Sequence, residues 1–498
     1  MSVVGLGTRS LLLSQSLVGM RAQLGDLQQQ FATGKRADTY AGMGTGRGLA
    51  VGLRSHLSAI EAYNDTITIT GMRIELSQTV LSRIGDIGRD AKASLSDVGS
   101  AEGRVTAQVQ AMSSLGEALG LLNTQAGDRY LFSGLASDKP AVVSLTALMD
   151  GELGRAGFNQ VVSERLQADL GAGGLGRLVI DQPAPGQIRI SEDVAGSIFG
   201  FKLAGISSTF AGATTSGPAG APTQADFDIG AANPNPGESL KVVFQLPDGS
   251  SETLTLTATT DPNAGPDTFL IGSDPTATAA NLQAALTDRV GHLARTALTA
   301  ASALAAADNF FNMDAANPPQ RVDGPPFDSA TGLRDATTAD TVFWYSGEAG
   351  SQPSRSTATA RIDQSINVSY GARANEEAIR WQLQNVAALA AISLPVTDAD
   401  AEARASALAL RLRPALDVPA GTQSVATIQA EMAGAHVSLK ATAERHVQTS
   451  ATVEDLIQGT EGISNEEVAA KILALQTALQ ASLQTTSRLF QISILNYL

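Results

Sequence analysis

Proline is confined to the middle of this 498-residue chain. All 19 prolines lie between Pro140 and Pro419, so the first 139 residues and the last 79 contain none. Proline in a helix interior removes a backbone hydrogen bond and clashes with the preceding turn, at a cost of about 3 kcal/mol. The distribution therefore predicts helical chain ends around an inserted region of mixed secondary structure.

Apolar residues near the N-terminus recur at alternating intervals of four and three, which is the spacing of a coiled-coil seam. This seam consists of Leu13, Leu17, Met20, Leu24, Leu27 and Phe31. We expect a first helix over about residues 6–34. A second is expected over about residues 45–125, as one helix on the order of 100 Å long.

The C-terminal end has the same pattern. Helices are expected over about residues 421–458 and 465–498, and Ser464 with Glu467 fits the capping box that begins a helix. The apolar positions of the last helix are Val468, Ile472, Leu475, Leu479, Leu483, Leu489, Ile492 and Leu495. Because a single amphipathic helix is marginal in water, we expect the two chain ends to pack on each other. An ordinary helical bundle with neighbouring termini is the alternative.

The middle of the chain has the signals of strands as well as helices. Residues 177–191 and 239–259 alternate apolar and polar side chains around turn residues, which is typical of β-hairpins. Residues 277–307 fit a helix, and residues 314–332 are expected to form a surface loop. A further helix is expected over about residues 375–412. The predicted fold class is therefore mainly α, with an inserted α+β region.

Charge and cysteine content exclude several classes of function. The net charge of −15 argues against nucleic-acid binding, which needs a basic surface. The chain has no cysteine, so disulfides, thiolate metal sites and cysteine nucleophiles are excluded. No apolar window is long enough to span a membrane. The first residues also lack the basic and apolar regions of a secretory signal, which by itself predicts a cytoplasmic protein.

No motif predicts catalysis, a metal site or a bound cofactor. The stretch "GMGTGRG" (Gly42–Gly48) lacks the Lys-Ser/Thr of a phosphate-binding loop and is expected to connect two helices. The four histidines do not have metal-ligand spacing, and the acidic and amide residues of 314–341 lack that of a calcium loop. The aromatic segment "VFWYSG" (Val342–Gly347) is expected to be a packed strand, with ligand binding as the alternative.

Four segments at the two ends of the chain carry a recognisable pattern. They are "FATGKRADTY" (Phe31–Tyr40), "DRYLFSGLASDKPAV" (Asp128–Val142), "VSYGARANEEAIR" (Val368–Arg380) and "ALQASLQTTSRLFQISILNYL" (Ala478–Leu498). In their order and position they resemble the flagellin superfamily, and within it the hook-associated proteins that join the flagellar hook to the filament. After Arg36 the sequence departs from the family pattern, because "ADTYAGMGTGRGLA" replaces a proline-containing stretch.

The resemblance implies a layered rod with long coiled-coil helices from both chain ends and a variable outer domain in the middle. Residues 1–42 with 459–498 would form an inner terminal coiled-coil layer. Residues 43–139 with 360–458 would form a helical rod layer, and residues 140–359 the outer α+β domain. The apolar residues of the first and last helices, from Leu13 to Phe31 and from Val468 to Leu495, would be the assembly seam.

The resemblance also implies a function. The chain would be a structural, non-enzymatic protein of the bacterial flagellum, extracellular and exported by the flagellar type III apparatus without a cleaved signal. Its partners would be copies of itself, a neighbouring hook-associated protein, flagellin, and an export chaperone on the C-terminal helices, with no nucleic acid and no membrane insertion. A filament-forming flagellin is the first alternative, and another helical assembly or adhesin protein the second.

Overall fold

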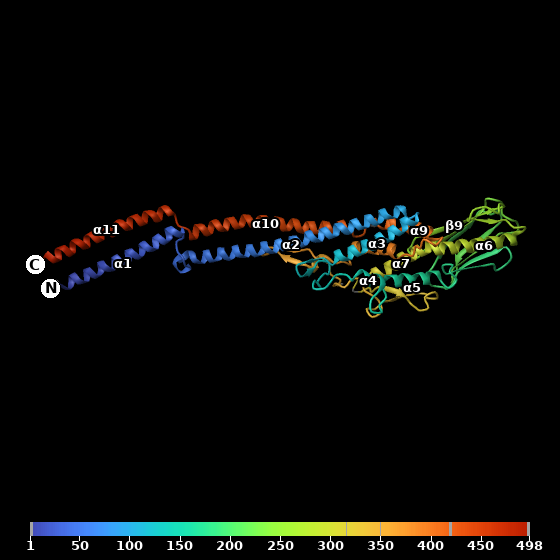
Figure 1. Ribbon diagram of the computed structural model, residues 1–498, viewed down its shortest axis with the longest axis horizontal. Helices are drawn as coiled ribbons and strands as arrows, with labels where there is room; N and C mark the ends of the chain where they lie inside the picture. Colours follow the sequence, from blue (N-terminus) through green and yellow to red (C-terminus); the bar gives the residue numbers. More distant parts are fainter. Residues whose placement is uncertain (1–2, 315, 349, 418–420, 496–498) are drawn as a thin grey trace. The chain divides into compact units, whose positions relative to one another are not determined.

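The computed structural model describes residues 3–314, 316–348, 350–417 and 421–495. The chain is mainly helical, and its small β-sheets are confined to the middle of the sequence (Figure 1). Its contacts divide it into two units. The first unit consists of Met1–Thr70, Arg361–Val368 and Val437–Leu498, and the second unit of Gly71–Ala360 and Ser369–His436.

In the first unit, the two ends of the chain lie side by side. Helix α1 (Val3–Thr33) packs along α11 (Asn465–Leu495), and the two helices are antiparallel (Figure 1). A short 3-10 segment, η1 (Tyr40–Gly46), follows α1. Helices α2 (Arg47–Ser94) and α10 (Val425–Glu461) contribute residues to both units. The helices expected near both chain ends are therefore present.

The helix expected over residues 45–125 is interrupted, and that prediction is wrong as a single helix. A 3-10 turn, η2 (Leu95–Asp97), follows α2, and α3 (Ala101–Leu122) begins after it. Ser100 Oγ accepts a hydrogen bond from the Gly103 backbone N–H at 2.9 Å, which caps the new helix. This serine cap, directly after the 3-10 turn, is the local cause of the break.

Helix α3 folds back against α2. Arg83 on α2 donates two hydrogen bonds to the Glu117 carboxylate on α3, at 2.6 and 2.8 Å. The turn between the helices is tight, since a Cβ at Gly103 would lie 1.9 Å from the Asp97 carbonyl oxygen. The chain therefore reverses where a continuous helix was expected.

The remaining helices belong to the second unit. They are α4 (Leu145–Asp150), α5 (Phe158–Leu170), α6 (Pro275–Leu293), the π-helical segment η3 (Ala294–Leu298), α7 (Thr299–Phe311), α8 (Glu377–Ala391) and α9 (Ala401–Ala415). Helices α6 and α7 continue through η3, so the helix predicted over 277–307 is confirmed. The helix expected over 375–412 is two helices, α8 and α9. Pro395 lies in the break, where it has no N–H to continue the helical ladder.

Two four-stranded sheets lie in the second unit. Their strands are β3 (Leu178–Asp181), β4 (Gln187–Glu192), β5 (Lys202–Ser208), β6 (Thr214–Ala219), β7 (Gln224–Asp228), β8 (Ser239–Gln245), β9 (Ser251–Thr259) and β10 (Thr268–Leu270). The strand orders are β3-β4-β7-β6 and β10-β9-β8-β5. The hairpins β3–β4 and β8–β9 confirm the strands predicted from the sequence. Inward residues of the strands, such as Phe227 and Phe244, share one core with Leu282 of α6 and with Phe201, which directly precedes β5.

Short strand pairs complete the structure. They are β1 (Gln125–Ala126) with β2 (Arg129–Tyr130), β11 (Gln320–Val322) with β12 (Leu333–Asp335), and β13 (Thr359–Arg361) with β14 (Asn367–Ser369); η4 (Ser354–Thr357) is a single 3-10 turn. The predicted loop over 314–332 thus includes a strand, β11. In the predicted strand over 342–347, Tyr345 forms one isolated bridge, with Val142, and the segment is not a named strand. Trp344 in this segment is fully buried, and its Nε1 donates to the Phe311 carbonyl at 3.0 Å.

Candidate assembly surface on the terminal helices

The predicted apolar seam includes the most buried positions among the described side chains of α1 (residues 11–33) and α11 (residues 465–488). On α1, half-buried side chains recur at Leu13, Leu17, Met20, Leu24 and Leu27, and the residues between them are exposed. On α11, Val468 and Leu479 are buried and Ile472 and Leu475 are half-buried. The alternating four-and-three spacing therefore identifies the faces on which the two helices meet.

The seam differs from the prediction at its ends. Phe31 is 47% exposed and Leu483 is 46% exposed, and neighbouring polar residues, Gln30 and Ser482, are the half-buried ones instead. An α-helix has 3.6 residues per turn, so a residue four positions after a contact is rotated slightly away from the partner helix. This applies to Phe31, four positions after Leu27, and to Leu483, four positions after Leu479. The predicted seam residues Leu489, Ile492 and Leu495 have side chains outside the described residues.

The space between the two terminal helices is incompletely filled. A hollow of about 550 Å³ lies between them. It is lined on α1 by Gln23, Asp26, Leu27 and Gln30, and on α11 by Lys471, Ala474, Leu475 and Ala478. Two of the α11 positions are alanine, whose side chains are too short to reach across a helix pair. Leu27 and Leu475 therefore line a groove that is open to solvent.

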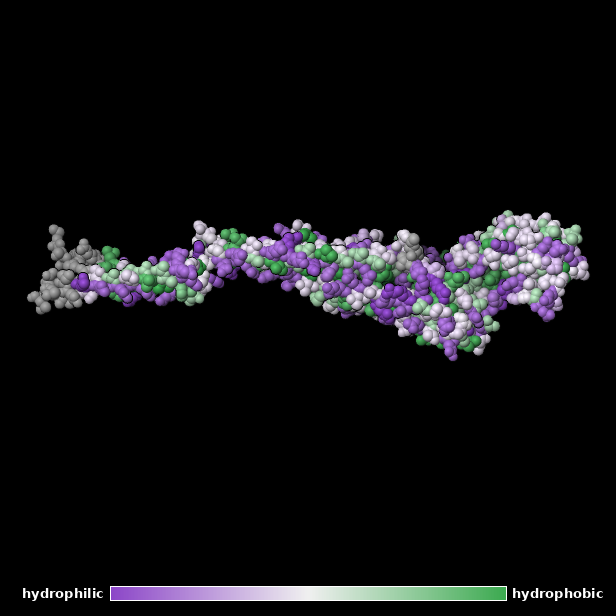
Figure 2. All heavy atoms as spheres, turned by 90° about the horizontal axis from the view of Figure 1, so that it is seen from above, coloured by the Kyte–Doolittle hydropathy of each residue, from purple (hydrophilic) through white to green (hydrophobic). Residues whose placement is uncertain are grey.

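Apolar side chains also lie on the outer faces of the two helices. Leu11, Leu12, Val18 and Leu473 each expose about two thirds of their surface, between 65% and 67%. Figure 2 shows such hydrophobic residues among hydrophilic ones on this part of the surface. Sequence reasoning missed this set, because it does not follow the seam spacing. A helix pair with apolar residues on several faces has surface that is suited to further helices.

The segments that follow α1 and precede α11 are joined by backbone hydrogen bonds, and we call this junction the clasp (residues 34–36 and 461–463). The Arg36 N–H donates to the Glu461 carbonyl at 2.8 Å, and the Ile463 N–H donates to the Gly34 carbonyl at 3.1 Å. Arg36 Nε also donates to the Gly462 carbonyl at 2.9 Å. The clasp connects residues more than 400 positions apart in the chain.

An ion pair on the neighbouring helices reinforces the clasp. Arg54 on α2 donates Nε and Nη2 to the two carboxylate oxygens of Glu461, at 2.8 and 2.6 Å. The hydrogen bond from Arg54 lowers the pKa of the Glu461 carboxyl. Nothing in the residue spacing signalled this pair, since partners so distant in sequence carry no local pattern.

The second unit holds a similar junction between outgoing and returning segments. The Ala374 N–H donates to the Phe132 carbonyl at 2.8 Å, and the Gly134 N–H donates to the Ala372 carbonyl at 3.2 Å. Arg373 binds the Glu348 carboxylate through Nη2 at 2.6 Å. Two of the four segments that carry the flagellin resemblance, Asp128–Val142 and Val368–Arg380, therefore contact each other directly.

The other sequence candidates are dispersed. The glycine-rich stretch forms η1 and the first turn of α2, and Gly44 has a positive φ of 55°. His446 is buried with Nδ1 2.9 Å from Asn64 Oδ1, whereas His56 is exposed. Within the described ranges, no group of three or more His, Asp or Glu residues is arranged to hold a metal ion. No described helix is both long and apolar enough to cross a membrane.

Comparisons with known proteins identify no family for this chain. No protein-family model matches it, and no curated protein is significantly similar to it.

Proposed function

We propose that this chain is a structural protein of the bacterial flagellum that joins hook to filament through its helical ends. One observation carries the proposal: the first and last helices lie together, and they leave apolar residues and an open groove facing solvent. The direct contact between two segments of flagellin-like sequence supports it. No catalytic role is proposed.

In this proposal the chain is a flagellin-like layered rod. Residues 1–42 and 459–498 form an inner coiled-coil layer, residues 43–139 and 360–458 a second helical layer, and residues 140–359 an outer domain. In the assembled structure, α1 and α11 pack against the same helices of neighbouring subunits. Burial of one exposed Leu contributes about 1.5–3 kcal/mol. Each neighbour adds several such contacts, so assembly is cooperative.

The proposal also defines partners and location. The chain assembles with copies of itself, with a second hook-associated protein and with flagellin, outside the cell after export by the flagellar type III apparatus. An export chaperone covers the C-terminal helices before assembly, because their exposed leucines would otherwise aggregate. In the free monomer, limited proteolysis should remove both chain ends first and leave a stable fragment from the second unit.

A deletion experiment tests the proposed function. Cells that lack the gene should have hooks without filaments and should release unpolymerised flagellin into the medium, and expression of the intact chain should restore filaments. Electron microscopy of the hooks and immunoblotting of the medium measure both outcomes. Hooks that still carry filaments in the deletion strain would exclude a junction role.

Polymerisation of the purified chain separates the junction protein from a filament-forming flagellin. A flagellin should polymerise into long filaments as purified protein, without hooks. A junction protein should remain monomeric or form short assemblies until hook fragments are added. Long filaments from the pure chain would therefore replace the junction proposal by the flagellin one.

A further inference from the structure

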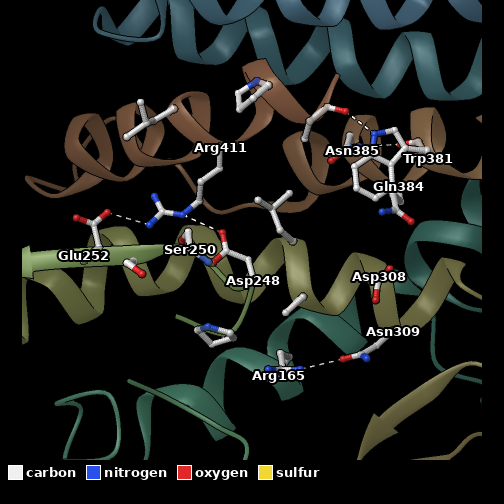
Figure 3. A pocket seen from close by; sticks show the side chains of 17 residues that line it. Arg165, Asp248, Ser250, Glu252, Asp308, Asn309, Trp381, Gln384, Asn385 and Arg411 are labelled. Carbon is white, nitrogen blue, oxygen red and sulfur yellow. Dashed lines mark hydrogen bonds and ion pairs between the residues drawn. The ribbon is translucent and has the colours of Figure 1, made fainter. Parts of the chain in front are cut away.

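The second unit contains a cavity that the proposed assembly role does not use. Its volume is about 640 Å³, within the range of about 300–1,000 Å³ typical of small-molecule sites. Helices α7, α8 and α9 and the turn between β8 and β9 form its walls (Figure 3). The lining includes one aromatic residue, Trp381, and a set of polar side chains at the same end.

Two adjacent residues of α7 present one acceptor and one donor to the cavity. Arg165 Nη1 donates to Asn309 Oδ1 at 2.9 Å, which orients the Asn309 amide and leaves its Nδ2 to donate. The Asp308 carboxyl accepts no hydrogen bond from any described residue. Desolvation raises the pKa of this carboxyl and the nearby Arg380 guanidinium acts in the opposite direction, although the residue as a whole is exposed.

A third polar group reaches the cavity from the opposite wall. Gln384 on α8 is 5% exposed, and its Oε1 has no hydrogen-bond partner among the described residues. In Figure 3 its amide points from α8 into the space that Asp308 and Asn309 face from α7. A buried amide atom without a partner is unfavourable, because it has lost its hydrogen bonds to water and gained none in the protein. A bound ligand that hydrogen-bonds to this amide would remove that cost.

The two guanidinium groups that line the cavity are already paired with carboxylates of the protein. Arg165 Nε binds Asp169 at 2.8 Å, and Arg411 binds both Asp248 and Glu252, at 3.0 and 2.9 Å. Both guanidinium groups therefore already bind carboxylates, and neither is free to bind an anionic ligand. The groups that remain for a ligand are amides, hydroxyls and the single Asp308 carboxyl.

A second cavity of about 360 Å³ adjoins the first and shares Asp308 and Asn309 with it. Most of its lining is again amide or carboxyl: Asn312, Asn317, Gln320 and Asp335. Planar amides and carboxyls side by side offer alternating donors and acceptors. Each hydroxyl of a vicinal diol both donates and accepts, so the two patterns are complementary.

Trp381 adds an apolar surface in a fixed orientation. Its Nε1 donates to the Ala415 carbonyl, which holds the indole ring at the cavity wall beside Pro414. A rigid aromatic face can pack on the C–H face of a sugar ring, while polar groups bind the hydroxyls at the ring edge. The first cavity supplies both kinds of surface.

We propose that these two cavities form one binding site for a neutral saccharide. One ring occupies the first cavity, against Trp381. Asp308 and Asn309 bind a pair of neighbouring hydroxyls at the junction, and Gln384 binds a third. The second cavity takes the next ring, so an oligosaccharide binds more tightly than a monosaccharide.

Tryptophan fluorescence of the full chain tests the proposal, because the chain has only two tryptophans. Trp344 is fully buried and away from the cavity lining, so the Trp344→Phe variant isolates the emission of Trp381. The probes are chitobiose, cellobiose, maltose and lactose, with their monosaccharides and with spermidine as a cationic comparison. We expect a saturable change with at least one disaccharide and a weaker response to its monosaccharide.

Matched variants identify the site. Asp308→Asn keeps the shape of the side chain and Asn309→Ala removes the donor, and each should weaken binding about tenfold, which corresponds to one hydrogen bond. Asn263→Ala, an exposed position between β9 and β10, should leave binding unchanged. Circular dichroism at each step verifies that the variants fold. No response to any of the four disaccharides, a response to spermidine alone, or binding that survives both variants would overturn the proposal.

Discussion

Replacement of Leu479 by aspartate tests whether the two chain ends depend on each other. Leu479 is 8% exposed on α11, and its removal from the interface forfeits about 2 kcal/mol of apolar burial. Desolvation of the new carboxylate adds about 1 kcal/mol or more. The free energy of local opening should therefore fall by about 3 kcal/mol, which corresponds to a roughly 100-fold faster amide exchange in α1 and α11.

Hydrogen–deuterium exchange of the monomer measures this change, and Leu473→Asp is the matched control. Leu473 lies six residues earlier on the same helix and is 67% exposed, so the same substitution there removes little burial. Exchange in α11 should differ between the two variants by at least about tenfold. Peptides from α6 and α7, in the second unit, should exchange at the same rate in both.

Two results would refute this reasoning. If Leu479→Asp leaves exchange in α1 unchanged, the first and last helices do not stabilise each other. If Leu473→Asp accelerates exchange as much as Leu479→Asp, the difference in burial between the two leucines does not govern the stability of the pair. In the deletion strain, Leu479→Asp should fail to restore filaments.

Three further predictions concern stability and pH. Gly103→Ala places a methyl group 1.9 Å from the Asp97 carbonyl oxygen and should lower stability by about 2 kcal/mol in chemical denaturation. Burial opposes ionisation of Asp340, but hydrogen bonds from neighbouring donors prevail and lower its pKa to about 2. Asp340→Asn should therefore cost about 1 kcal/mol at neutral pH after allowance for solvent screening. The difference from the unaltered chain should disappear as pH falls from about 4 to 2. Glu461→Gln should lower the free energy of unfolding by about 0.5 kcal/mol above pH ~5, a small value because its partner Arg54 is half exposed. This loss should vanish at acid pH, where the carboxylate is protonated. Denaturation curves at several pH values measure the stability of the Asp340→Asn and Glu461→Gln variants. If the difference in stability between either variant and the unaltered chain does not change with pH, the ionised carboxylate is not its cause.

Local sequence rules predicted the helical ends and the hairpins because those elements depend on nearest neighbours. The absence of proline near both ends can be read without any knowledge of the fold. The same holds for the heptad spacing that includes Leu17 and Leu24 in the first helix and Leu479 in the last. The break before α3 was also local, since Ser100 is a strong cap, but the continuing apolar pattern masked it. Pro395 is a stronger signal for a helix break than Ser100. It has no N–H to continue a helix, so the sequence alone is enough to divide the helix expected over 375–412 at this residue.

The candidate surface was predictable only in part. Seam spacing identified Leu479 as buried, but it could not indicate that Leu11 and Leu12 lie on an outer face or that the groove beside Leu475 is unfilled. Those properties depend on which side chain faces which across two helices from opposite ends of the chain. The cavity beside Trp381 was beyond sequence reasoning for the same reason, because its walls come from helices and a turn far apart in the sequence.

The open groove between α1 and α11 connects stability to assembly. Leucines such as Leu27 and Leu475 are only half-buried in the isolated pair, so the apolar contact that would stabilise the pair is incomplete. Any helix that fills the groove binds the paired state and not the unpaired one, and it therefore stabilises the pair by mass action. The stability of the terminal helices should then rise with protein concentration or with added hook fragments, while that of α6 and α7 should not. If protein concentration and hook fragments change amide exchange neither in the terminal helices nor in α6 and α7, no helix occupies the groove.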